Sequence, residues 1–165
     1  MRILVSVLTG LLVVGSSFGE DTKIDVSRVI DKSDAILILG DSVRDPSPRS
    51  GEGEDGYYSK CNYYGVHGAK SLVIRLHIPN AGSIDAQKQL QMLAATNGEM
   101  QNVLGLGDTA QTFSSGGETG VASRLLMLYV VKGNTFVMVG LGGFADDLIA
   151  LAKAKAVAQK ILDHL

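Results

Sequence analysis

Several residue types are scarce in this sequence, and each scarcity removes a possibility. The 165 residues include a single cysteine, three histidines, three prolines and no tryptophan. A single cysteine cannot form an intrachain disulfide in any redox compartment, so the fold must be stabilised without one. Three prolines beside 20 glycines are typical of a chain with many turns rather than a disordered one. With 45% hydrophobic residues, a chain of this length can form one domain with its own core.

The net charge and the spacing of possible metal ligands exclude further classes of function. The formal net charge of −2 provides no basic surface for nucleic acid, so we predict no nucleic-acid partner. The acidic residues within 52–55 depart from the pattern of calcium loops, and we interpret them as a solvated loop. No two histidines have the spacing of metal ligands: His67, His77 and His164. The sequence therefore predicts neither a metal site nor a cofactor.

The beginning of the chain has the pattern of a cleaved secretory signal. A positive Arg2 precedes a short apolar run, and small residues stand at the positions −3 and −1 of a cut before Glu20. The alternatives are a buried first strand and an uncleaved anchor, but the run is too short to span a bilayer comfortably. We therefore expect residues 1–19 to be a signal peptide. Residues 20–165 should form a single domain without a stable membrane anchor, located in the periplasm or secreted.

The last third of the chain carries the clearest secondary-structure signals. Two apolar runs, 124–131 and 135–141, flank Gly133-Asn134, a pair suited to a type II′ hairpin turn. Beyond residue 143 the apolar period changes from 2 to about 3.6, which predicts a helix. Its apolar stripe contains Leu148, Leu151, Ala154, Ala158, Ile161 and Leu165. The hairpin and the helix can bury each other's apolar faces, so we expect them to form the core.

The middle of the chain predicts further elements joined by short links. Residues 25–34 favour a helix, whereas 35–39 fit either its continuation or a buried strand. Residues 41–60 hold two prolines and three glycines and indicate a long exposed loop. The remaining predictions are strands at 61–65, 71–78 and 109–114 and a helix at 84–96 capped by Ser83. The order α-β-β-α-β-β-β-α predicts the α+β class, with an antiparallel sheet of about five strands and helices packed on it.

Tyrosines are concentrated in one stretch. Four of the five lie within eight residues: Tyr57, Tyr58, Tyr63 and Tyr64. Tyrosine presents a flat apolar area with a polar tip and is common at binding surfaces, so these four are our ligand-binding candidates. The alternative is that alternate tyrosines pack into the core while the others lie on the surface of a sheet. Cys61, in the same stretch, is expected to be a buried structural thiol.

One short block indicates an enzyme. Residues 35–42, AILILGDS, resemble the first block of the SGNH (GDSL-type) hydrolases, in which Ser42 would be the nucleophile. That resemblance implies an Asp-x-x-His pair near the C terminus and a Gly-x-Asn-Asp block. Here Asp163 and His164 are adjacent, and the second block is absent from the sequence. A small serine hydrolase that uses Ser42 and His164 is therefore the alternative function.

The order of the elements as a whole resembles a different group. It combines a lead helix, a Pro-rich loop, a Cys-x-Tyr strand at 61–63, GLGD-x-A at 105–110, a Lys-Gly turn and a C-terminal helix. This arrangement is similar to small exported bacterial domains of unknown function related to the extracytoplasmic sensor domain of receptor-type Ser/Thr kinases. The kinase sensor domains carry disulfides that this chain cannot form. The resemblance implies an antiparallel sheet with helices on it and a non-catalytic binding role, with a small ligand or an envelope protein as the partner.

Overall fold

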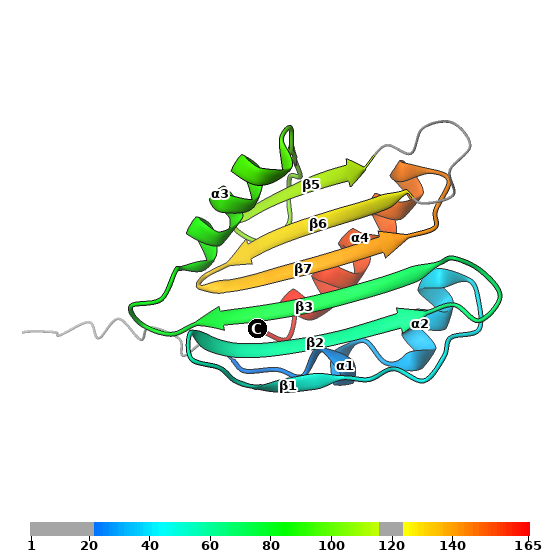
Figure 1. Cartoon of the computed structure of the whole chain (residues 1–165), viewed down its shortest axis with the longest axis horizontal. Coiled ribbons are helices and arrows are strands. Elements are labelled where there is room, and N and C mark those ends of the chain that lie inside the picture. The colour runs from blue at the N-terminus through cyan, green and yellow to red at the C-terminus, as the bar shows by residue number, and fades with distance from the viewer. Residues whose placement is uncertain (1–21, 116–123) are drawn as a thin grey trace, which may run out of the picture.

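A seven-stranded antiparallel sheet forms the middle layer of the protein (Figure 1). The computed structural model describes residues 22–115 and 124–165, so the predicted signal peptide lies outside the described residues. The strands are β1 (Arg49–Glu52), β2 (Gly56–Tyr64), β3 (Ser71–Pro79), β4 (Gln101–Asn102), β5 (Thr109–Ser115), β6 (Leu125–Lys132) and β7 (Thr135–Gly142). Their order across the sheet is β1-β2-β3-β7-β6-β5-β4.

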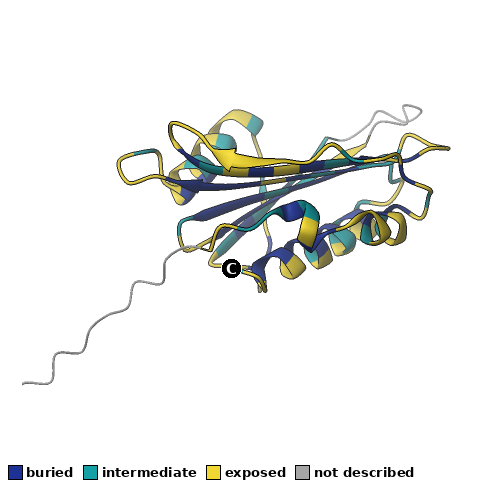
Figure 2. Cartoon of the chain, turned by 90° about the horizontal axis from the view of Figure 1, so that it is seen from below, coloured by how far each residue is buried: buried dark blue, intermediate teal, exposed yellow. Residues whose placement is uncertain are grey.

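The helices lie on both faces of this sheet (Figure 2). One face, called the inner face here, is covered by α1 (Val26–Val29), α2 (Lys32–Leu39) and α4 (Asp147–Leu162). Of the described helices, only α3 (Ala86–Asn97) lies on the opposite, outer face, where it packs against β6 and β7. The layers are therefore unequal, because no helix of the described chain lies over a large part of the outer face.

The predicted α+β class and antiparallel sheet are confirmed, but the predicted number of strands is wrong. The sheet has seven strands because β1 and β4 add one strand at each edge. All residues of β1 are exposed and none is apolar, and β4 has only two residues, so neither produces a periodic pattern. The predicted loop at 41–60 is also wrong in its second half. It contains β1 and the start of β2, which pair from Arg49 opposite Lys60 to Glu52 opposite Tyr57.

The predicted lead helix is divided into two short helices, and residues 35–39 are helical. Asp31 interrupts the first helix and caps the second with a reciprocal pair of hydrogen bonds. The Asp34 amide donates to the Asp31 carboxylate at 2.9 Å, and the Asp31 amide donates to the Asp34 carboxylate at 3.0 Å. Gly40 ends α2 in the left-handed region, with φ of 62°. Local capping therefore decides for a helix where the apolar pattern allowed a strand.

Alternate residues of the central strands build the main core on the inner face. Cys61 and Tyr63 of β2 are each 1% exposed, which confirms that Cys61 is a buried thiol. Burial raises the pKa of this thiol. The Tyr63 hydroxyl donates a hydrogen bond to the Ile30 carbonyl, and the Ser59 hydroxyl accepts one from the Val26 amide at 2.9 Å. These two bonds attach α1 to β2 and satisfy polar groups that would otherwise be buried without partners.

Helix α4 closes the core over β6 and β7. Its small buried residues, among them Ala154 and Ala158, allow the helix to approach the sheet closely. Leu148, predicted to lie on the buried stripe, is instead 79% exposed. It precedes the buried Ala150 by two residues and is therefore rotated by about 200° around the helix axis.

The packing of α4 can be tested with two alanines of the same helix. Ala158 is fully buried, whereas Ala156 is exposed. Ala158→Asp places an unpaired charge in the core at a cost of several kcal/mol, against total stabilities of about 5–15 kcal/mol, so the domain should unfold. Ala156→Asp should change the free energy of unfolding by only about 0.5 kcal/mol, measured by chemical denaturation. Similar small effects of the two substitutions would show that α4 is not part of the core.

Candidate functional site

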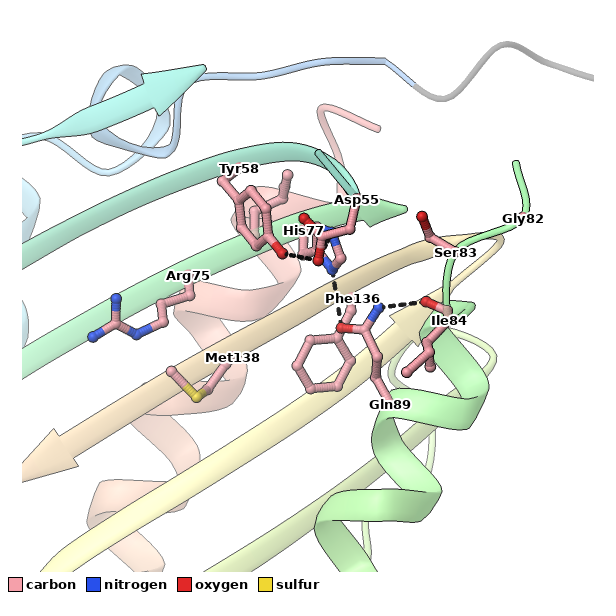
Figure 3. Close-up of a pocket in the computed structure, with 11 residues that line it drawn as sticks. Asp55, Tyr58, Arg75, His77, Gly82, Ser83, Ile84, Gln89, Phe136 and Met138 are labelled. Carbon is pink, nitrogen blue, oxygen red and sulfur yellow. Dashed lines mark hydrogen bonds and ion pairs between the residues drawn. The ribbon is translucent and has the colours of Figure 1, made fainter. Parts of the chain in front are cut away.

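A pocket of about 550 Å³ opens on the outer face beside the N-terminal end of α3 (Figure 3). Its floor is formed by β3 and β7, one side by β2, and the opposite side by α3 and the residues just before it. Most of its lining is apolar, with a few polar groups at defined places. The side chains central to its chemistry are Tyr58, Arg75, His77, Gln89, Phe136 and Met138. A preformed concave site of this size and mixed lining is typical of small-molecule sites.

A chain of hydrogen bonds fixes the polar side chains of the pocket. The ring of Tyr58 stacks on the ring of His77 with centroids 4.1 Å apart and planes 6° from parallel. The Tyr58 hydroxyl donates to Oδ2 of Asp55 at 2.6 Å. On its other side, His77 places Nδ1 3.0 Å from Oε1 of Gln89. The side-chain nitrogen Nε2 of Gln89 donates to the Ile84 carbonyl at 2.8 Å.

These hydrogen bonds leave one ring nitrogen of His77 without a partner. Nε2 of Gln89 donates to Ile84, so it is Oε1 of Gln89 that faces His77. Because Oε1 can only accept a hydrogen bond, Nδ1 of His77 must carry the hydrogen. In the neutral imidazole, Nε2 is then an acceptor. Nε2 is buried and has no hydrogen-bond partner in the part of the chain that the structure describes. The His77 side chain as a whole is only 9% exposed. The distance of 4.0 Å from Nε2 to Oδ2 of Asp55 is too long for a hydrogen bond.

The turn before β2 holds Asp55 in place. Gly56 has φ of 149°, and a Cβ at this position would lie 2.1 Å from the Ile78 carbonyl oxygen, so only glycine fits. The Asn80 amide donates to the Asp55 carbonyl at 2.8 Å, and the Gly53 amide donates to the Gly56 carbonyl at 2.7 Å. The carboxylate is therefore presented by a rigid backbone at the edge of the pocket.

The β6–β7 turn positions α3 over His77. Gly133 has φ of 57°, as the first central residue of a type II′ turn requires. The side chain of Asn134, the next residue, donates to the Pro79 carbonyl at 3.1 Å and accepts from the Ala86 amide at 3.4 Å. Asp85, rather than the predicted Ser83, caps α3 by accepting from the Lys88 amide at 2.7 Å. The turn thus joins the end of β3 to the start of α3, which brings Gln89 to the histidine.

Electrostatics keep the Tyr58–Asp55 pair in one protonation state near neutral pH. Partial burial and the hydrogen bond to Asp55 raise the pKa of Tyr58 to about 12. The same hydrogen bond lowers the pKa of Asp55 below its usual value. The pair is therefore a neutral phenol donating to a carboxylate, and the phenol is not a ready proton acceptor.

A second pocket of about 480 Å³ adjoins the first on the same face. It lies over β1, β2 and β3, and it shares Tyr58, Arg75 and Leu76 with the first pocket. Its other lining residues include the basic Arg49 and Lys60. We refer to these two adjoining pockets together as the depression.

The structure divides the four tyrosines predicted to bind a ligand. Tyr58 lines both pockets. Tyr57 and Tyr63 point to the inner face, where their hydroxyls donate to backbone carbonyls of the N-terminal segment. Tyr64 is 48% exposed on the outer face, but its hydroxyl accepts from Asn62 and it lines neither pocket. The period of two along β2 separates residues that are neighbours in sequence, so Tyr63 is unavailable to a surface ligand.

Sequence reasoning missed most of the pocket. His77 carried a visible signal, since it is a polar residue in an otherwise mostly apolar strand. Gln89, Phe136 and Met138 carried none, because each has an unremarkable place in its own helix or strand. The pairing of β3 with β7 places Phe136 opposite His77 and Met138 opposite Arg75, whereas Gln89 reaches His77 from α3.

The residues of the alternative hydrolase are not joined into a catalytic pair. Ser42 is exposed just after α2, and its hydroxyl makes no hydrogen bond to a histidine within residues 22–115 and 124–165. Nδ1 of His164 lies 2.8 Å from the Lys160 carbonyl oxygen. Nδ1 of His67 lies 3.0 Å from Oδ1 of Asp41, and this contact lowers the pKa of the Asp41 carboxyl. Each of the two histidines thus has another partner.

Comparison with known proteins adds no family assignment: no family model matches the chain, and no curated protein matches its sequence. Among the described residues, no helix has the length and apolar character needed to cross a membrane. The same residues contain no group of three or more His, Cys, Asp or Glu side chains arranged to hold a metal ion.

The link between Tyr58 and Asp55 predicts a pKa change. Asp55→Asn removes the negative charge beside the phenol, so the pKa of Tyr58 should fall from about 12 towards the ordinary 10.0. The titration can be followed by NMR of the tyrosine ring carbons. Tyr129 is the control, because burial raises its pKa and no carboxylate contributes to that rise. An unchanged pKa of Tyr58 would show that Asp55 does not hold its hydroxyl.

The reactivity of Ser42 tests the hydrolase alternative, which requires an activated serine at this position. Without a base in contact with its hydroxyl, Ser42 should not react with a fluorophosphonate probe, as measured by intact mass. Ser42→Ala should also leave the free energy of unfolding within about 0.5 kcal/mol, since the residue is exposed. Labelling that disappears in the Ser42→Ala variant would make the hydrolase the leading function.

Proposed function

We propose that this protein is an exported, non-catalytic module that binds a small ligand in the outer-face pocket. The observation that carries the proposal is the unpartnered Nε2 of His77. A buried polar atom without a partner costs about 1–3 kcal/mol, and a ligand donor entering the pocket would remove that cost. The surrounding apolar lining would bury the body of such a ligand.

The chemistry of the pocket favours binding over catalysis. A catalytic histidine is usually oriented by a carboxylate that stabilises its protonated form. Here Nδ1 of His77 faces the neutral amide of Gln89. Ser83 also lines the pocket but makes no hydrogen bond to His77 among the described residues. The phenol of Tyr58 is already committed to Asp55, which leaves no activated nucleophile.

The proposal of export rests on the signal-like pattern of residues 1–19 and on the resemblance to exported sensor-like domains. Such a location suits a module that detects a compound in the cell envelope. The size of the pocket favours a small ligand over an envelope protein, because a protein partner would require a much larger contact surface.

A fragment screen read out by two-dimensional NMR tests this function. Hits should shift the backbone amides of His77, Ile84 and Met138. Met138→Trp should abolish their binding by filling the pocket, whereas Met92→Trp, at a half-exposed position of α3 outside the pocket, should not.

Three results would contradict the proposal. The first is a library without hits, the second is hits that shift amides elsewhere, and the third is full binding by Met138→Trp. Conversion of a bound fragment into a product would favour an enzyme instead.

A further inference from the structure

Three basic side chains stand in one row across the sheet beside the pocket. The strand register places Arg49 directly opposite Lys60, and Lys60 directly opposite Arg75. All three residues are exposed and line the second pocket, and Arg75 also lines the first. We call these three residues the basic row.

The basic row is unfavourable for the sheet alone. Neighbouring strands lie about 4.8 Å apart, and like charges directly opposite each other destabilise a strand pair. No carboxylate among the described residues forms an ion pair with any member of the row. Glu52, which lines the same pocket, pairs with Lys23 at 2.7 Å, and Asp55 accepts from Tyr58. The positive charge of the row is therefore uncompensated within the described chain.

The polar groups of the depression are arranged along a line. Arg75 and His77 point to the same face of β3, two residues and hence about 7 Å apart along the strand. In Figure 3, Arg75 lies at one end of the pocket, and His77 and Gln89 lie towards the other. Tyr58 lies opposite His77 on β2, and Met138 lies opposite Arg75 on β7, so the two line the pocket from the two sides of β3.

We propose that the ligand of this pocket is a small organic anion with a hydrogen-bond donor at its opposite end. Its donor would bind Nε2 of His77, its apolar or aromatic body would lie between Tyr58 and Met138, and its anionic group would contact Arg75 and Lys60. A guanidinium can bind a carboxylate or a phosphate through two parallel hydrogen bonds. The two residues are about 7 Å apart along the strand, which is of the same order as the length of one six-membered ring with substituents at opposite ends. This inference rests on the proposed function and specifies its ligand class.

Three matched compounds separate the contributions of the two ends. 4-Hydroxyphenylacetate has both the donor and the anionic group, phenylacetate lacks the donor, and 4-hydroxyphenylacetamide lacks the charge. In NMR titrations of the protein, 4-hydroxyphenylacetate should have the lowest Kd. The amide should bind about tenfold more weakly, the difference expected for one charge-assisted hydrogen bond. Added salt should weaken binding of the two carboxylates but not of the amide.

Variants then assign the charge effect to the row. Arg75→Gln should raise the Kd of 4-hydroxyphenylacetate about tenfold and leave that of the amide unchanged. Arg44→Gln is the control, because Arg44 is exposed and lines neither pocket. Lys60→Gln should also raise the unfolding midpoint of the free protein, since it removes both repulsions in the row. A lower midpoint would contradict the uncompensated row on which the inference depends.

The outcomes distinguish this inference from the proposed function. If the amide binds as tightly as the carboxylate, or if Arg75→Gln has no effect, the ligand is not an anion and only the inference fails. If none of the three compounds shifts the pocket amides, the inference fails. If the fragment screen also gives no pocket ligand, the proposed function fails with it.

Discussion

Backbone hydrogen bonds between β3 and β7 join two halves of the chain that are far apart in sequence. Strands β1, β2 and β3 form one antiparallel meander, β4 to β7 form another, and the β3–β7 pair is their only link within the described sheet. Its register places Arg75 opposite Met138 and His77 opposite Phe136. A slip of one residue would send one member of each pair to the inner face. The core and the pocket both depend on this register.

The two faces of the sheet have different roles because they are covered unequally. On the inner face, three helices bury the alternate apolar residues of all the central strands. On the outer face, α3 covers β6 and β7 with a smaller cluster that includes Leu90, Tyr129 and Phe136. The pocket lies where this cover ends. Its apolar floor continues the smaller cluster, while its polar rim combines Tyr58 of β2 and Arg75 of β3 with Gln89 of α3.

Charged side chains near α2 have a structural role, because each is paired with a group of the fold itself. Lys70 and Lys153 donate to the carbonyls of Leu39 and Ile38, at 2.8 and 2.6 Å, and so satisfy the C-terminal end of the helix. Lys160 pairs with Asp34 at 2.8 Å. The basic row and Nε2 of His77 have no such partners among the described residues. Groups that the fold leaves unsatisfied are those with free capacity for a ligand.

Local patterns in the sequence determined the elements that are marked by apolar residues or turn residues. Alternation predicted β3, two apolar runs on either side of Gly133-Asn134 predicted β6, β7 and their turn, and a 3.6-residue period predicted α4, because each depends on near neighbours in the chain. The edge strand β1 has no apolar residue, so only pairing with β2 decided it. The tertiary structure likewise decided the site. It is assembled from β2, β3, β7 and α3, and contacts between residues so distant in sequence leave no periodic trace in the sequence.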